Sequence, residues 1–218
     1  MFKSIQMVLG VICLLSTTSQ LIAADAPALT LGVPVFNGDG CSKDTTDIAL
    51  TDDKQTLSIL FSAFSVSSAK PSENQRKKCD IRVPVKVPAG FSISIIQSEY
   101  RGFNFLPPGA SATLKADYFL VGVRGPGYRW NFPDRNYADA TPDRGTGILK
   151  SDFYRSNKIQ ATGLVYGPCG KDTTISIKSS LDVTSNGRGD KSDSNLDSLD
   201  ITTKTPVLYK LTWRTCRE

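Results

Sequence analysis

The sequence predicts an all-β fold: a single antiparallel β-sandwich or open barrel with two disulfides and one long irregular loop. Three observations lead to this class. Apolar and polar residues alternate with a period of two in several short segments, and no window shows the 3.6-residue repeat of an amphipathic helix. Turn-forming residues separate these segments. Four cysteines remain after an export signal, an even number that suits two bridges.

The first 24 residues have the layout of a secretory signal peptide. Lys3 precedes an apolar run over residues 7–15, and small Ala23 and Ala24 stand before Asp25. The run is too short to span a bilayer, and no second apolar span follows it. We therefore expect one domain over residues 25–218 with no membrane span. The protein should be secreted: extracellular, or periplasmic if the source is a Gram-negative bacterium.

The net charge is small. The sequence has 26 Lys and Arg against 21 Asp and Glu, a formal net charge of +5, and removal of the signal takes away Lys3 and leaves +4. A dispersed charge of this size argues against a nucleic-acid partner, and export argues against it further.

The cysteines of the mature chain are expected to pair. Cys13 leaves with the signal, so Cys41, Cys79, Cys169 and Cys216 remain, and three pairings are possible. None of them lies in a CxxC, and the chain has no His, which excludes a Cys/His zinc site. Hairpin geometry favours Cys41 with Cys79 and Cys169 with Cys216. We expect no metal and no cofactor.

The N-terminal half reads as a series of short strands. Residues 29–36 form a first candidate that ends at the turn 37–40, Ile48 and Leu50 mark a second, and residues 56–66 are apolar on both faces, as in the middle of a sandwich. Residues 79–87 alternate strictly, and the turn 88–90 leads into the apolar run 91–96. We expect these last two segments to be adjacent strands joined by a short turn. Residues 112–122 hold another candidate.

The C-terminal half has two irregular stretches. Residues 124–160 are rich in Gly, Pro, Asp, Arg and aromatics, which predicts a long loop with at most a short strand near residues 148–154. Order returns at residues 161–166 and in the alternating strand 173–183. A polar loop is expected over residues 185–199. The last strand, 205–216, is expected to return antiparallel to 173–183, which would bring Cys216 beside Cys169.

Several short blocks, taken in their order along the mature chain, resemble the sequences of one family. They include Gly38-Asp39-Gly40-Cys41, Phe61-Ser62-Ala63-Phe64, Arg76 to Cys79 with Val87 to Phe91, Tyr100-Arg101-Gly102-Phe103, Tyr118-Phe119 with Gly122, Gly167-Pro168-Cys169-Gly170, Asp197-Ser198-Leu199-Asp200 and Leu211 to Cys216. The family is a secreted one, catalogued as domain of unknown function 4360. The resemblance implies export, paired cysteines and one all-β domain, and brings no catalytic residues. Residues 125–160 do not align with it.

The possible catalytic chemistry is narrow. Without His, the Ser-His-Asp and Cys-His nucleophile systems are excluded, so only a carboxylate pair such as Glu99 with Asp117 would support a hydrolase. The alternative is that Glu99 is an ion-paired residue at a strand end.

The polar loop contains two possible binding motifs, a group of acidic residues and a tripeptide, and each also has a purely structural explanation. A calcium site would need oxygen ligands gathered from Asp190, Asp193, Asp197 and Asp200, but their spacing is not that of a calcium-binding loop, and solvated acids are the alternative. Arg188-Gly189-Asp190 is an integrin-type tripeptide that a simple turn also explains.

Aromatic and basic residues interleave at the start of the long loop. Aromatic rings stack on sugars and Arg binds anions in a bidentate manner, so this mixture suits a glycan or an acidic polymer. The alternative is that the rings fold back to close one end of the sandwich. The candidate ligand surface comprises Tyr128, Arg129, Trp130, Phe132, Arg135 and Tyr137.

These observations favour a non-catalytic binding protein for a surface or extracellular ligand such as a glycan or acidic polymer. The alternatives are a carboxylate-dependent hydrolase and a structural or inhibitory secreted protein.

Overall fold

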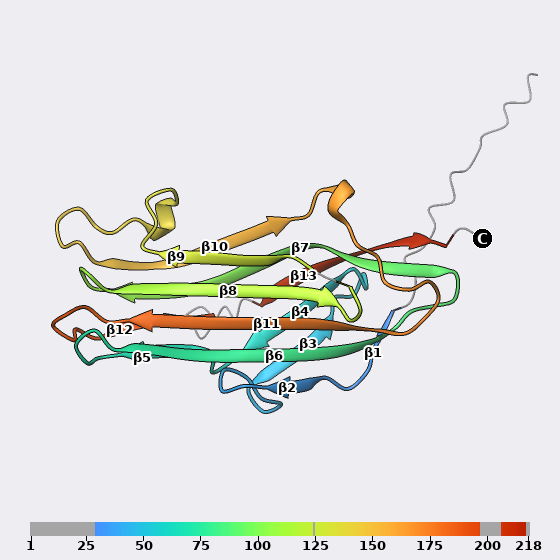
Figure 1. Ribbon diagram of the computed structural model, residues 1–218, viewed down its shortest axis with the longest axis horizontal. Helices are drawn as coiled ribbons and strands as arrows, with labels where there is room; N and C mark the ends of the chain where they lie inside the picture. The colour runs from blue at the N-terminus through green and yellow to red at the C-terminus, as the bar shows by residue number, and fades with distance from the viewer. Residues whose placement is uncertain (1–28, 124, 197–205, 217–218) are drawn as a thin grey trace, which may run out of the picture.

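Two antiparallel sheets pack face to face (Figure 1). The computed structural model describes residues 29–123, 125–196 and 206–216; the expected signal peptide and the residues Asp197 and Asp200 lie outside these ranges. The first sheet has the order β1-β6-β11-β8-β9, with β2 also paired to β6. Its strands are β1 (Thr30–Leu31), β2 (Val35–Asn37), β6 (Asn74–Lys86), β8 (Ser111–Leu120), β9 (Gly127–Phe132) and β11 (Thr173–Thr184).

The second sheet has the order β3-β4-β13-β7-β12-β5, with β10 also paired to β7. Short 3₁₀ turns, η1 (Ala138–Ala140) and η2 (Ala161–Gly163), flank β10. No helix in the described part of the chain is long and apolar enough to cross a membrane. The strands are β3 (Thr46–Leu50), β4 (Thr56–Phe61), β5 (Ser65–Ser68), β7 (Phe91–Leu106), β10 (Leu149–Lys158), β12 (Ser192–Asn195) and β13 (Val207–Thr215).

The core lies between the two sheets and is formed by the inward-facing residues of their strands. Ile81 and Val83 on β6 lie opposite Ile177 and Ile175 on β11, and all four are buried. Each such side chain contributes about 1.5–3 kcal/mol when it leaves water. The alternating polar residues of these strands face outward, so the expected all-β sandwich is confirmed and its two surfaces follow from the sequence pattern.

The expected pairing of the strands around the turn 88–90 is wrong. β6 belongs to the first sheet and β7 to the second, so Gly90, with a φ of +81°, helps to carry the chain from one sheet to the other. The strands around residues 173–183 and 205–216 are separated in the same way, because β11 pairs with β6 and β8 while β13 pairs with β4 and β7. A period of two shows which face is buried but not which strand is the hydrogen-bonded neighbour.

The stretch 124–160 is more regular than expected. It contains β9, which pairs with β8, and β10, which pairs with β7 along its whole length. The polar loop 185–199 likewise contains β12, and the apolar run 56–66 is split between β4 and β5. The short strand expected near residues 148–154 corresponds to β10, which continues to Lys158 beyond the buried Arg155, where the apolar alternation is interrupted.

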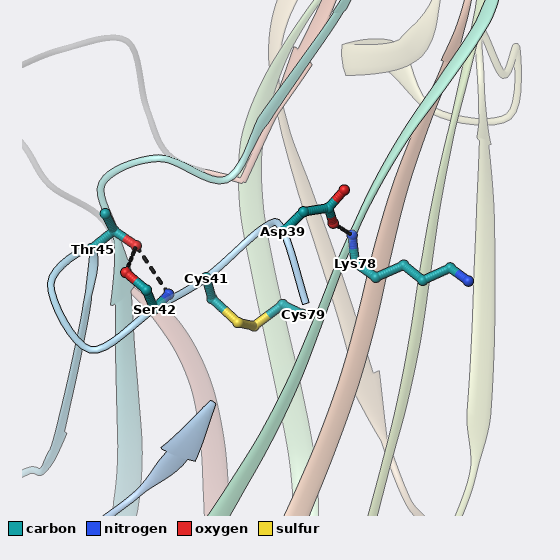
Figure 2. The surroundings of a disulfide bond; sticks show 6 residues. All are labelled: Asp39, Cys41, Ser42, Thr45, Lys78 and Cys79. Atoms are coloured by element: carbon teal, nitrogen blue, oxygen red, sulfur yellow. Dashed lines mark hydrogen bonds between the residues drawn. A yellow bond between two sulfur atoms is a disulfide. The ribbon is translucent and has the colours of Figure 1, made fainter. Parts of the chain in front are cut away.

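Both expected disulfides are present. Cys41 is bonded to Cys79 and Cys169 to Cys216, with Cα atoms 5.3 Å and 6.0 Å apart. Cys41 lies in the connection from β2 in the first sheet to β3 in the second, and Figure 2 shows it bonded to Cys79 on β6. These are the pairs that hairpin geometry favoured, although each pair joins segments that do not form a hairpin.

Candidate functional site

Three cations form a line across the outer face of the first sheet. Lys78 on β6 lies opposite Ser180 on β11, Ser180 lies opposite Lys115 on β8, and Lys115 lies opposite Arg129 on β9. We call Lys78, Lys115 and Arg129 the basic row. Because neighbouring strands are about 4.8 Å apart, the row runs perpendicular to the strands with regular steps.

The basic row is not neutralised by acids. None of its three members forms an ion pair among the described residues. On one side of the row Arg76 is paired with Asp182. On the other side, Lys178 stands opposite both Asp80 and Asp117. The two neighbouring rows are therefore compensated, whereas the basic row is not.

The surface is hollowed on both sides of Lys115. One hollow of about 340 Å³ is bordered by Lys78, Lys115 and Lys178, and also by the carboxylates of Asp80 and Asp117. A second, of about 170 Å³, is bordered by Arg76 with its partner Asp182, and by Lys115 and Arg129. Both are shallow depressions on an exposed sheet, which leaves the cations accessible to a ligand from solvent.

The loop that contains the Cys41–Cys79 disulfide fixes the backbone of Lys78. The Lys78 N–H donates to Asp39 Oδ1 at 2.7 Å, and the Gly40 N–H donates to the Lys78 carbonyl at 2.8 Å. Figure 2 shows the side chains of Lys78 and Cys79 leaving β6 in opposite directions. Gly38 is required here, because its φ is +114° and an added Cβ would lie 2.3 Å from the Lys78 carbonyl oxygen. The disulfide thus anchors the strand while Lys78 faces solvent.

The basic row also conflicts with the usual rules of sheet stability. Lys115 and Arg129 have like charges and lie directly opposite each other on antiparallel strands. Such pairs are destabilising, and local conflicts of this kind concentrate at functional sites.

The predicted ligand surface is divided by β9. Arg129 points outward, but Tyr128, Trp130 and Phe132 occupy the alternate positions and point between the sheets. Trp130 packs 5.2 Å from the Tyr100 ring, and Phe132 is only 1% exposed. These three rings therefore pack on the core of the sandwich.

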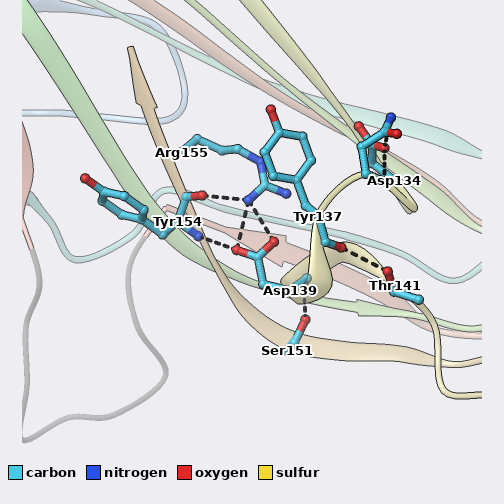
Figure 3. Close-up of polar contacts among 8 residues, drawn as sticks. Asp134, Tyr137, Asp139, Thr141, Ser151, Tyr154 and Arg155 are labelled. Carbon is cyan, nitrogen blue, oxygen red and sulfur yellow. Dashed lines mark hydrogen bonds and ion pairs between the residues drawn. The ribbon is translucent and has the colours of Figure 1, made fainter. Parts of the chain in front are cut away.

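The remaining members of that surface lie beyond β9. Arg135 is exposed, and Tyr137, 41% exposed, covers the guanidinium group of buried Arg155 at 4.0 Å (Figure 3). Of the six residues, only Arg129 belongs to the basic row. The sequence pattern missed Lys78 and Lys115 because their proximity depends on the strand register.

The carboxylates considered for hydrolysis do not come together. Glu99 is on β7 of the second sheet, where it bonds to Gln97 and pairs with Lys210 at 3.2 Å. Asp117 is on β8 of the first sheet and faces the opposite side of the sandwich. The two carboxyl groups therefore cannot act on one substrate bond, and Glu99 is an ion-paired strand residue.

The acids of the polar loop have local partners. Asp190 accepts hydrogen bonds from Asn186 and Arg188, which lower the pKa of its carboxyl group. The Arg188–Asp190 ion pair, at 2.9 Å, closes the integrin-type tripeptide on itself. Asp193 pairs with Lys191. No group of three or more Cys, Asp or Glu residues that could hold a metal is found in the described part of the chain.

Comparisons with known proteins identify relatives but no activity. Residues 27–216 match the sequence model of the family described as "Domain of unknown function (DUF4360)". An uncharacterized secreted protein from Arthroderma benhamiae is 26% identical over 184 residues, which cover 83% of this chain and 69% of that protein. The expected secreted location is thereby confirmed.

Among solved structures, a carbohydrate-binding module studied for specific mannan recognition is similar over 84% of this chain and 98% of its own. The identity is 10% and the TM-score is 0.27, so this likeness supports no conclusion about a ligand.

Proposed function

This chain belongs to the secreted family of DUF4360 domains, and from that premise we propose that it binds an acidic extracellular polysaccharide on the outer face of its first sheet. The basic row is the observation that supports the proposal. Three cations without acidic partners lie in a line on a rigid, disulfide-anchored sheet.

The chemistry of the row suits carboxylate or sulfate groups. The Arg129 guanidinium can bind either group through two parallel hydrogen bonds, and Lys78 and Lys115 act as point charges with rotatable donors. Ser180, between the two lysines, adds a hydroxyl group that can bond to a sugar hydroxyl.

The shape of the surface favours a polymer over a small anion. An extended chain laid across the strands would meet Lys78, Lys115 and Arg129 in succession, and several weak contacts would add together. Small anions would meet only one or two of these exposed cations in water, where each contact is weak.

The test compares two double variants with the same change of charge. Lys115→Gln with Arg129→Gln removes two cations of the basic row. Lys150→Gln with Lys158→Gln removes two exposed lysines from β10 in the second sheet. We expect the first variant to lose most of its retention on immobilised polygalacturonate and on a sulfated glycan, and the second to be retained like the unmodified protein.

Salt provides a further check. Retention should disappear near 1 M salt, where the Debye length is about 3 Å. Comparison of the two resins shows whether carboxylate or sulfate is preferred. Equal loss of retention in both variants, or retention on neither acidic resin, would exclude the proposed function.

A further inference from the structure

The larger hollow beside the basic row combines cations with acids. It measures about 340 Å³, and its border includes Lys78 and Lys115 from the basic row and Asp80 and Asp117 from the next row of the sheet. Ligand sites in proteins usually measure about 300–1,000 Å³. A hollow at the small end of that range suits one sugar residue of a polymer.

The cations and the acids form two parallel rows. Asp80 follows Lys78 by two positions on β6, and Asp117 follows Lys115 by two positions on β8. Both strands are antiparallel to β11, so they run in the same direction and both acids lie on the same side of the basic row. At about 3.3 Å per residue, the two rows are about 6.6 Å apart along the strands. This spacing is close to the width of one sugar ring.

The acids are not engaged by a cation. Lys178 stands opposite both Asp80 and Asp117 and offsets their charge, but its ammonium group lies 5.8 Å from the centre of the Phe119 ring. Neither acid forms an ion pair with any residue that the structure describes. Asp117 is exposed, and Gly127, directly opposite on β9, has no side chain to cover it. The Asp117 carboxylate is therefore open to a hydrogen-bond donor from solvent.

A uronic acid residue carries both groups that such a hollow would bind. In a 1→4-linked residue, the carboxylate on C5 and the hydroxyl on C2 lie on opposite sides of the chain axis. The carboxylate suits Lys78 and Lys115, because hydrogen bonds between charged groups are the strong ones. The hydroxyl is a donor and suits the Asp117 carboxylate, which only accepts. A sulfate ester at that position would have no proton to donate and would bring a like charge against Asp80 and Asp117.

We propose that this hollow is a subsite for one 1→4-linked uronic acid residue, so that the ligand is a carboxylated and not a sulfated polysaccharide. The inference rests on the proposed function and specifies its ligand. Lys78 and Lys115 bind the carboxylate, Asp117 accepts a hydrogen bond from the C2 hydroxyl, and Asp80 adds to the repulsion of sulfate. The chain axis then runs across the strands, which brings a neighbouring sugar residue beside Arg129.

The test titrates the secreted protein with three polymers at one salt concentration. These are polygalacturonate, polygalacturonate acetylated on its hydroxyl groups, and dextran sulfate of matched charge density. We expect the acetylated polymer to bind about two- to tenfold more weakly than polygalacturonate, as the loss of one hydrogen bond would cause. Dextran sulfate should also bind more weakly. Equal or tighter binding of dextran sulfate would overturn the uronate subsite and leave the proposed function standing, whereas binding of none of the three would overturn both.

A near-isosteric variant tests the acid. Asp117→Asn removes one negative charge, and long-range charge alone would then raise the affinity for both acidic polymers to the same extent. The uronate subsite instead predicts that the ratio of polygalacturonate affinity to dextran sulfate affinity falls about fivefold, because the first ligand loses a charge-assisted hydrogen bond and the second loses a repulsion. Asp152→Asn, the same change at an exposed position of β10, is the control and should leave this ratio unchanged. An unchanged ratio in Asp117→Asn, or an equal fall in both variants, would overturn the contact with Asp117.

Discussion

Both carboxylate oxygens of Asp139 accept hydrogen bonds from one nitrogen, Nη1 of Arg155, at 2.9 Å each (Figure 3). Arg155 is 2% exposed and lies between the rings of Tyr137 and Phe132, whose centroids are 4.0 Å and 4.9 Å from its Cζ atom. Its Nε and Nη2 atoms have no hydrogen-bond partner among the described residues. Nη1 also donates to the Tyr154 carbonyl at 2.6 Å, so one carboxylate, one carbonyl and the faces of aromatic rings hold a buried cation that joins η1 to β10.

Removal of the carboxylate should therefore destabilise the protein. Asp139→Asn leaves a buried, unpaired guanidinium, and we expect a loss of about 2 kcal/mol, less than for a fully buried pair because the Asp139 side chain is 33% exposed. Urea denaturation measures the change in the free energy of unfolding.

A second substitution separates the charge from the shape of the side chain. Arg155→Met in the Asp139→Asn background removes the unpaired charge and keeps an apolar stem, so it should recover most of the lost stability. If the double variant is less stable than Asp139→Asn alone, the packing of Arg155 and not its charge is the main contribution.

Three buried tyrosines predict a loss of stability at alkaline pH. Burial raises the pKa of Tyr100, Tyr118 and Tyr209 above the ordinary value of 10.0. The Tyr209 ring contacts those of Tyr100 and Tyr118, and Tyr100 and Tyr209 share a hydrogen bond at 3.0 Å. The unfolded chain loses these protons first. The stability contribution is therefore complete below pH 10 and declines as pH rises toward the folded-state pKa values.

The expected slope above pH 10 is about 1.4 kcal/mol per pH unit for each tyrosine that stays protonated in the folded state. Tyrosinate absorbance should rise together with the loss of native circular dichroism, and Tyr209→Phe should reduce the slope by about a third. Full ionisation of all tyrosines in a protein that keeps its native spectrum would contradict this account.

The elements differed in how well the sequence predicted them. Apolar residues alternate with polar ones over residues 79–86 of β6 and over most of β11, so the existence and the buried faces of these strands were evident. β10 was predicted only in part, as a short strand near residues 148–154, because Arg155 stands at a buried position and interrupts the apolar alternation. Sheet membership of β7 and β13 was also missed, since short turns such as residues 88–90 connect strands within a sheet and between sheets equally well.

The candidate site depends on register, which the sequence does not show. Arg129 was noticed for its aromatic neighbours, yet Tyr128 and Trp130 turned out to face the core. Lys78 and Lys115 are 37 positions apart in the printed sequence and meet in one row only because β11 lies between their strands. The sequence showed which positions of each strand are polar. Only the strand pairing shows which charged residues on neighbouring strands lie opposite one another.

The basic row should show a conflict between stability and binding. Lys115→Gln removes the repulsion with Arg129 on the facing strand, and we expect it to raise the free energy of unfolding by about 0.5 kcal/mol at low ionic strength. The gain should disappear near 1 M salt because exposed charges are then screened. Affinity for an acidic polysaccharide should fall in the same variant. Lys150→Gln, on the opposite sheet, serves as the control and should change neither property.

The two disulfides should be separable by their effect on binding. The bonded cysteines are 38 and 47 positions apart, so loop entropy predicts a similar loss of about 4 kcal/mol for Cys41→Ala with Cys79→Ala and for Cys169→Ala with Cys216→Ala. Only the first pair lies beside the loop that fixes the Lys78 backbone through Asp39 and Gly40. Under conditions where both variants are folded, we therefore expect polysaccharide affinity to fall in the Cys41/Cys79 variant and to be retained in the Cys169/Cys216 variant. Both affinities are measured by titration with the same polysaccharide at one salt concentration. Equal affinity in the two variants would show that the position of Lys78 does not depend on the Cys41–Cys79 disulfide.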